Sequence, residues 1–215
     1  MKDLYIFGAG GFGREVAWLV DRINKVNPTW NLLGFIDGND SIQDQVFNGY
    51  PVLGKENDIL KYKDAYCVVA VGASKTREKI VNKLKSINPN IKFGTLVDPS
   101  VEMSEYVEIG EGSIICAHTI ATVNITIGRH VIINLDCTIG HDAILHDFVT
   151  LYPSVNVSGM TSIGHAVELG TGMQIIQGKQ VGDYSIVGAG SVVINDIIEK
   201  CTAVGIPAKT IKFFE

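Results

Sequence analysis

The sequence has no long apolar run. Its longest nearly unbroken one, residues 65–73, is far shorter than the roughly 20 residues that a membrane-spanning helix requires. The N-terminus turns polar and glycine-rich too soon for a secretory signal peptide. We therefore expect a cytoplasmic protein without membrane insertion. Of the 215 residues 46% are hydrophobic and 19% charged, a balance that excludes disorder and predicts a packed globular chain.

Paired cysteines are also missing. Cys67, Cys116, Cys137 and Cys201 form no CxxC pair and stand among apolar or small residues, so we expect reduced structural thiols. The histidines are dispersed without acidic partners at metal-ligand spacing, and no metal is expected. Because a nucleophile-elbow motif is absent too, direct attack on a substrate is favoured over a covalent intermediate with the enzyme.

Basic residues are scarce in the second half of the chain. Between Val97 and Ile198 only Arg129 and Lys179 are basic, against eleven acidic residues, so this half should repel nucleic acid. The first 94 residues hold 13 of the 18 basic groups. Their bunched lysines and arginine at positions 75, 77 and 79 fit either a small anionic ligand or a solvated helix face.

Short apolar runs alternate with helical stretches over residues 2–94. This pattern predicts four parallel strands, the last at 92–98, with helices at 14–24 and 76–87 and a loop after the second strand. Gly8, Gly10 and Gly13 form G-x-G-x-x-G between the first strand and first helix, where backbone amides bind phosphate. Asp37 follows the second strand, a usual place for a contact with ribose or base. The short sheet favours a mononucleotide or nucleotide sugar over NAD, and a plain tight turn is the alternative.

After Gly94 the apolar residues recur every six positions. All 17 positions from Val97 to Val193 at this step are apolar, and seven of them precede glycine. Such hexapeptides predict a solenoid in which three repeats make one triangular coil of 18 residues, with aliphatic side chains inside. About five and a half coils result, capped by the first domain and by residues 197–215.

His141 is the candidate general base. It follows a glycine at a coil corner, so its side chain should lie at an outer edge, and histidine has a suitable pKa for this role. One coil later stands Gly159, which we expect to leave space for a substrate beside the histidine and an exposed amide for an oxyanion. A solvated turn histidine is the plain alternative. Weaker candidates are His118, His130 and His165, with His146 a closer rival.

Several motifs together resemble one family, namely FGAGGFGREV, GFIDG, VAVGASKTR, N-x6-HD from Asn134 to Asp142, IVGAGSVV and VGIPAK. They resemble the left-handed β-helix acyltransferases, specifically the bacterial sialic acid O-acetyltransferases and UDP-4-amino-sugar N-acetyltransferases. The resemblance implies an α/β Rossmann-like, nucleotide-sugar-binding domain over residues 1–94. Over residues 95–215 it implies an all-β left-handed parallel β-helix that binds acetyl-CoA, with a C-terminal cap. Such proteins are homotrimers that bind acetyl-CoA between adjacent β-helices.

The resemblance also assigns residues. It makes His141 the base and Asp142 the acid that orients it. Together with the anion-binding geometry of a helix N-terminus, the resemblance implies a set of substrate-binding residues. They are Gly8, Gly10, Gly11, Gly13, Asp37, Ser74, Lys75, Arg77 and Asn134. It implies binding of acetyl-CoA by Gly159, Gly170, Thr171, Gly188, Ala189, Ile206, Pro207 and Lys209. The chain departs from the closest N-acetyltransferases at Thr150, where they carry a second histidine, and at His146, where glycine is usual.

The implied activity is transfer of acetyl from acetyl-CoA to the amino group of a nucleotide-linked amino sugar, with UDP as the expected nucleotide. Its product would serve surface glycan or glycoprotein synthesis. One alternative is O-acetylation of a sialic acid or another sugar hydroxyl. A second is a non-catalytic trimeric scaffold that binds a nucleotide sugar.

Overall fold

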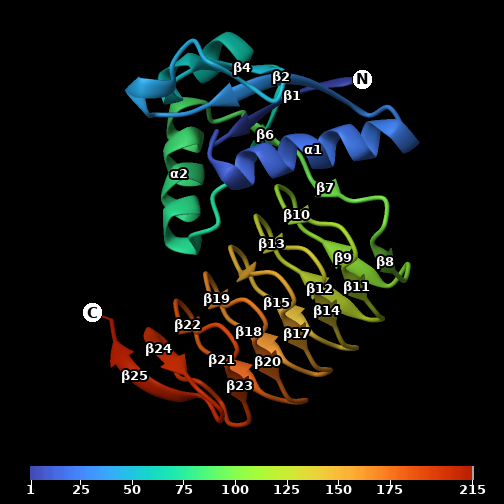
Figure 1. Ribbon diagram of the computed structural model, residues 1–215, viewed down its shortest axis with the longest axis vertical. Helices are drawn as coiled ribbons and strands as arrows, with labels where there is room; N and C mark the ends of the chain where they lie inside the picture. The colour runs from blue at the N-terminus through green and yellow to red at the C-terminus, as the bar shows by residue number, and fades with distance from the viewer. Residues whose placement is uncertain (215) are drawn as a thin grey trace.

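Two units follow each other along the chain, an α/β domain and a three-sided β-helix (Figure 1). The computed structural model describes residues 1–214, so Glu215, the last residue of the predicted cap, lies outside the described part. Figure 1 shows helix α1 (Gly11–Val26) between the sheet of the first unit and the coils of the second. The predicted fold class is confirmed.

The first unit is a six-stranded sheet in the order β3-β4-β2-β1-β5-β6. Its parallel strands are β1 (Lys2–Phe7), β2 (Trp30–Ile36), β5 (Tyr66–Val69) and β6 (Lys92–Phe93). Successive residues of a strand point to opposite faces, so Leu4 and Ile6 of β1 pack with α1 while Tyr5 and Phe7 pack with α2 (Ser74–Ile87). The sheet is therefore covered on both faces, as an α/β domain requires.

The segment predicted as a loop after the second strand contains a hairpin, so that prediction was wrong. Strands β3 (Val46–Phe47) and β4 (Tyr50–Gly54) pair antiparallel, and β4 also pairs in parallel with β2. Asn48 and Gly49 form the two-residue turn, with φ of 52° and 87°. Asn-Gly is the strongest local hairpin signal, because both positions need positive φ. Short 3₁₀ helices at Asp40–Ile42 and Glu56–Tyr62 flank the hairpin.

The predicted strand at 92–98 is two strands in two different sheets. β6 ends the first sheet at Phe93, and β7 (Leu96–Val97) opens the β-helix. Gly94 stands between them, where an added Cβ would lie 3.2 Å from the Trp30 ring. The chain thus passes from one unit to the next within two residues.

The β-helix is left-handed and has three faces, each a parallel sheet. Face 1 contains β7, β10 (Ile114–Ile115), β13 (Ile132–Ile133), β16 (Thr150–Leu151), β19 (Glu168–Leu169) and β22 (Ile186–Val187). Face 2 contains β8 (Glu102–Met103), β11 (Ile120–Ala121), β14 (Thr138–Ile139), β17 (Asn156–Val157), β20 (Gln174–Ile175) and β23 (Val192–Val193). Face 3 contains β9 (Val107–Ile109), β12 (Ile125–Ile127), β15 (Ile144–Leu145), β18 (Ser162–Ile163) and β21 (Gln180–Val181).

The six-residue period builds the interior of these coils. Each strand pairs with the strand 18 residues away, as Ile115 with Ile133 and Ile133 with Leu151. Every position at this step from Ile115 to Val193 is buried, as predicted, whereas Met103 in the first coil is 41% exposed. Between faces the chain turns through corners that hold one residue with positive φ, Asn124 and Asp142 among them. Apart from glycine, asparagine and aspartate tolerate that conformation best.

The first unit sits on the outer side of face 1. There Leu96, Ile114 and Ile132 belong to the same buried cluster as the apolar stripe of α1. Further along the same row the outward residues are Thr150 and Glu168, beyond the apolar contact with α1. At the other end, β24 (Cys201–Val204) pairs with β22, and β25 (Lys209–Phe213) folds back antiparallel on β24. This hairpin lies in the predicted cap.

Within residues 1–214 no helix is long and apolar enough to cross a membrane. All four cysteines are buried and free of disulfides, as predicted. The same described residues include no group of three metal-ligating side chains close enough to share an ion.

Candidate functional site

The glycine loop between β1 and α1 contains two kinds of glycine. Gly8 has a φ of 103°, and a Cβ on Gly13 would lie 1.9 Å from the Gly8 carbonyl oxygen, so these two are required by the backbone. Gly10 caps α1, and a Cβ on Gly10 or Gly11 would meet nothing within 4 Å. These two glycines therefore leave open space at the positive end of a helix dipole, which suits an anion.

Asp37 is tied to this loop. Its Oδ2 accepts a hydrogen bond of 2.9 Å from the Ala9 amide, and its Oδ1 accepts one of 2.9 Å from the Asn39 amide. The carboxylate thus holds the glycine loop beside the end of β2. Because carboxylate oxygens have further lone pairs, these two bonds leave capacity for a ligand hydroxyl.

A cleft of about 180 Å³ lies where α1 faces the β-helix. It is lined by Phe12, Glu15, Gly72, Ile132, Asn134, Thr150 and Tyr152. Two sequence-selected residues, Asn134 and Thr150, thus meet beside the glycine-loop helix. Below them the Tyr152 hydroxyl donates to Glu168 at 3.0 Å, and burial beside that carboxylate raises the pKa of Tyr152 to about 12. Tyr152 is therefore a neutral hydrogen-bonding wall of the cleft at physiological pH.

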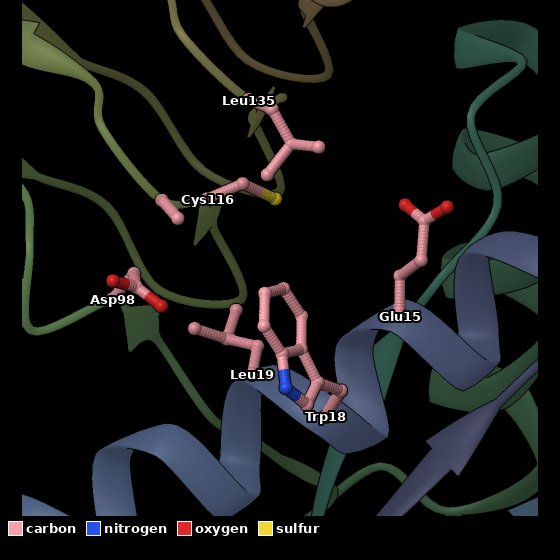
Figure 2. Close-up of a pocket in the computed structure, with 7 residues that line it drawn as sticks. Glu15, Trp18, Leu19, Asp98, Cys116 and Leu135 are labelled. Carbon is pink, nitrogen blue, oxygen red and sulfur yellow. The ribbon is translucent and has the colours of Figure 1, made fainter.

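A smaller pocket of about 30 Å³ adjoins this cleft through Glu15. Figure 2 shows Glu15, Trp18 and Leu19 of α1 opposite Asp98, Cys116 and Leu135 of the coils. Such a volume holds about one or two waters and no sugar. Arg22 pairs with Asp98 at 2.6 Å. Burial works against ionisation of Asp98, yet hydrogen bonds from Arg22 and Ser100 lower its pKa to about 2, so this pair fastens α1 to the first coil.

His141 and Asp142 lie on corner 2–3, the turn from face 2 to face 3. The His141 Nδ1 is 2.8 Å from Asp142 Oδ2, and hydrogen bonds with His141 and Asn124 hold the pKa of Asp142 below its usual range. Asp142 is therefore ionised and favours the tautomer with the proton on Nδ1, which leaves Nε2 able to accept a proton. Both side chains are about half exposed.

Gly159 stands one coil after His141, as the 18-residue period predicts. The predicted empty space above it is, however, occupied by the imidazole ring. A Cβ on Gly159 would lie 2.6 Å from His141 Nε2. Glycine is needed there so that the ring can lie across the next coil. Nε2 is therefore open to a ligand from the outer side of this corner, where the His141 side chain is 48% exposed.

The other predicted acetyl-CoA residues lie on a different corner and in the C-terminal hairpin. Gly170, Thr171, Gly188 and Ala189 follow β19 and β22 on corner 1–2, the turn from face 1 to face 2, in the same columns as Asn134 and Leu135. A Cβ on Gly170 would lie 2.5 Å from the Ala189 amide nitrogen, so close coil stacking by itself explains this glycine. The remaining three predicted residues fall in the exposed β24–β25 hairpin, namely Ile206, Pro207 and Lys209.

Arg77 is not a surface residue that closes over a ligand. Its side chain is 1% exposed, and its five N–H donors all reach backbone carbonyls, those of Val71, Gly72, His130, Phe148 and Val149. Burial lowers the pKa of Arg77 to about 10, which still leaves it cationic at neutral pH. The guanidinium therefore joins α2 to corner 3–1, the turn from face 3 to face 1. We correct its predicted role from substrate binding to domain docking.

Its neighbours on α2 make similar contacts between the units. The amide of the buried Ser74 donates a hydrogen bond of 2.9 Å to Glu168 Oε1, and its hydroxyl lies 3.1 Å from Thr150 Oγ1. The Lys75 ammonium lies over the rings of Tyr184 and Phe214, at 5.5 and 4.5 Å from their centroids. Both residues thus make contacts with the β-helix or its C-terminal segment, and Ser74 is fully buried.

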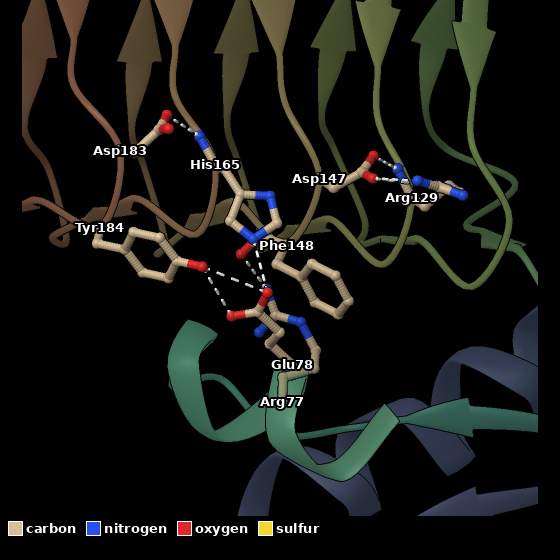
Figure 3. Close-up of polar contacts among 8 residues, drawn as sticks. All are labelled: Arg77, Glu78, Arg129, Asp147, Phe148, His165, Asp183 and Tyr184. Atoms are coloured by element: carbon tan, nitrogen blue, oxygen red, sulfur yellow. Dashed lines mark hydrogen bonds and ion pairs between the residues drawn. The ribbon is translucent and has the colours of Figure 1, made fainter. Parts of the chain in front are cut away.

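The rival histidines are spread over other corners. Figure 3 shows His165 and Tyr184 both directed at Glu78 of α2, and His165 Nε2 lies 2.8 Å from Glu78 Oε1. His130 is 1% exposed between the rings of Phe93 and Phe148. His146 is exposed on corner 3–1, and the His118 amide bonds to Ser100 on corner 1–2. His141 differs from all four because it pairs with a carboxylate of its own corner.

Asn124 is a site residue that the sequence analysis did not select. Its Nδ2 donates to Asp142 Oδ1 at 3.3 Å from one coil earlier. The signal was present, because stepping back 18 residues from Asp142 gives Asn124, just as stepping forward from His141 gives Gly159. Tyr152 and Glu168 were also missed, since the cleft beside Tyr152 and the bond from the Ser74 amide to Glu168 depend on how the first unit docks.

Comparison with known proteins places the chain in a family. The family model of the PglD N-terminal domain matches residues 3–84. The acetyltransferase domain of PglB from Neisseria gonorrhoeae FA1090, solved with acetyl coenzyme A, has 31% identity and a TM-score of 0.86, over 98% of this chain and 99% of that one. PerB from Caulobacter crescentus, solved with CoA and GDP-perosamine, has 27% identity and a TM-score of 0.85, over 98% of each chain. The chain belongs to the hexapeptide-repeat sugar acetyltransferases.

The curated relatives match only part of this chain. Serine acetyltransferase from Synechococcus elongatus is 33% identical over 81 residues, which are 34% of this chain and 33% of that protein. Across the curated relatives, the chain spans from 26% to 56% of their length. By contrast, the PglB and PerB structures match over nearly the whole of both chains.

Proposed function

We propose that this protein transfers acetyl from acetyl-CoA to the amino group of a nucleotide-linked amino sugar. The observation that carries the proposal is the pair of His141 and Asp142 on an open corner, in a chain whose first unit has free glycines at a helix N-terminus. The full-length relatives solved with acetyl coenzyme A and with GDP-perosamine support both substrate classes. We keep UDP as the expected nucleotide, with GDP as the alternative.

The chemistry at His141 is general base catalysis. His141 Nε2 takes a proton from the amine as its nitrogen attacks the thioester carbonyl, and Asp142 stabilises the imidazolium through Nδ1. The Gly159 amide is our proposed donor to the oxyanion of the tetrahedral intermediate. When the C–S bond breaks, the imidazolium returns the proton to the thiolate. The products are an N-acetylated sugar and free CoA.

The site is shared between subunits in this proposal. The first unit covers face 1, whereas His141 lies on the corner opposite that face, so the glycine loop of a chain is separated from its own His141 by the width of the coil. The predicted acetyl-CoA residues that precede the cap are likewise divided between corner 1–2 and corner 2–3. Corner 2–3 of one subunit against corner 1–2 of the next brings both sets together. Repeated around a three-fold axis, this contact closes as a homotrimer.

Free thiol release tests the function. We expect thiol release from acetyl-CoA with a UDP- or GDP-linked amino sugar and none with sialic acid or the corresponding hydroxyl sugar. His141→Ala should lower kcat roughly 10²- to 10⁴-fold, the usual value of a positioned base, while His146→Ala stays near wild type. Faster release with a hydroxyl acceptor would favour O-acetylation. Binding of acetyl-CoA without release on any acceptor would favour a scaffold.

A further inference from the structure

One side chain reaches the His141–Asp142 pair from the preceding coil. Asn124 and Asp142 occupy the same corner position in successive coils, with φ of 55° and 58°. The Asn124 amide group donates to Asp142 Oδ1 at 3.3 Å, while the other oxygen, Oδ2, lies 2.8 Å from His141 Nδ1. The three side chains therefore form a line along corner 2–3. Each oxygen of Asp142 has a different partner, which fixes the rotation of its carboxylate.

The same asparagine lines a separate cleft. This cleft has a volume of about 410 Å³, and its walls are Glu105, Tyr106, Glu108, Asn124, Ile125 and Thr126. It lies on the side of Asp142 toward the first coil, whereas Gly159 lies one coil away in the other direction. Glu105 and Glu108 are the ionisable carboxylates of this cleft, and together with Asp142 they are the acidic groups facing Asn124 from its own and the neighbouring coils.

We propose that Asn124 is a positioning residue that orients Asp142 so that its carboxylate holds His141 in the reactive tautomer. The proposal rests on the proposed function, because it assumes that His141 is the base. Hydrogen bonds to a carboxylate that itself orients a histidine tune the basicity and direction of the ring, as they do around metal-bound histidines. The lowered pKa of Asp142, caused by His141 first and by Asn124 second, agrees with this geometry.

Two substitutions separate this role from a purely structural one. Asn124→Asp keeps the shape and accepts positive φ, as Asp136 does at 59°, but it removes the donor and adds a charge. Asn124→Gly also fits positive φ and removes the side chain without adding charge. Asn48→Gly is the matched control, because Asn48 has a φ of 52° in the hairpin of the first unit.

Both Asn124 variants should lower kcat by a factor of roughly 3 to 10, the value of one hydrogen bond, with the KM for acetyl-CoA unchanged. In Asn124→Asp the second carboxylate favours the imidazolium, so the acid limb of the kcat/KM profile should move to higher pH. Asn124→Gly should not show that upward shift, and Asn48→Gly should match wild type. Native kcat and an unmoved acid limb in Asn124→Asp would overturn the proposal.

Nuclear magnetic resonance titration of the His141 ring gives a second readout that does not depend on turnover. The ring resonance is assigned by its loss in His141→Ala. One outcome combines an upward shift of this midpoint in Asn124→Asp with no thiol release from the wild type. It would support the contact from Asn124 through Asp142 to His141 and reject the proposed function. Turnover in the wild type with an unmoved His141 midpoint in Asn124→Asp would reject only the positioning role of Asn124.

Discussion

At the scale of single residues, His130 is a histidine whose ring packs in the interior and makes no hydrogen bond within residues 1–214. Among residues 1–214 its two ring nitrogens have no hydrogen-bond partner, and its ring is stacked 5.1 Å from that of Phe148. A Cβ on Gly112 would lie 2.3 Å from its Nδ1, so the ring fills its site completely. Burial first, and then the positive charges of Lys85 and Arg77, lower the pKa of His130 to about 3.

This buried imidazole predicts a loss of stability in acid. The unfolded chain binds a proton near pH 6.5, whereas the folded chain does so only near pH 3. The free energy of unfolding should therefore fall as the pH drops through that window and be intact above it. His130→Phe should remove this part of the loss, because Phe148 shows that a phenyl ring fits the same column with a φ of 62°. Thermal unfolding of the wild type and of His130→Phe at pH 7.5 and 4.5 measures this loss and its removal. An equal decrease in Tm for the two proteins would contradict this account.

At the scale of elements, helix α2 is the link between the two units. It contributes Arg77, Glu78 and the Ser74 amide to contacts with the coils, all at one corner and the adjoining face. Replacing Arg77 would leave several buried carbonyls without a donor. Each unsatisfied group costs about 1–3 kcal/mol before relaxation.

Arg77→Met should therefore lower the free energy of unfolding by about 2–5 kcal/mol, since the side chain keeps its bulk and loses all five donors. Lys79→Met, an exposed change on the same helix, is the control and should stay within about 0.5 kcal/mol. Urea unfolding measures the difference. Equal stability of the two variants would show that the buried guanidinium does not hold the units together.

Elements also show what the sequence could and could not predict. Every residue at the six-residue step from Ile115 to Val193 is buried, because burial inside a coil depends only on phase. The same period shows why Asn134 and His141, seven residues apart, lie on different corners, with β14 between them. Stepping by 18 finds column neighbours such as Gly159 and Asn124. The burial of Arg77 could not be predicted, because it depends on the docking of α2 against coils more than 50 residues away in sequence.

At the scale of the whole molecule, the proposed function makes a single chain an incomplete enzyme. The open glycines face one side of the coil and the base lies on the opposite corner, so the proposed reaction needs a second copy. Mixed trimers test this claim. Gly10→Trp should block the nucleotide sugar without disturbing the fold, because a Cβ there meets nothing within 4 Å. His141→Ala removes the base and leaves the glycine loop intact.

The most direct measurement is the thiol release of trimers assembled from equal amounts of Gly10→Trp and His141→Ala chains. Each variant alone should be nearly inactive. In random trimers about a quarter of the contacts join an intact glycine loop to an intact His141, so activity should return to about a quarter of the wild-type value. A mixture no more active than the sum of its two components would contradict the shared site.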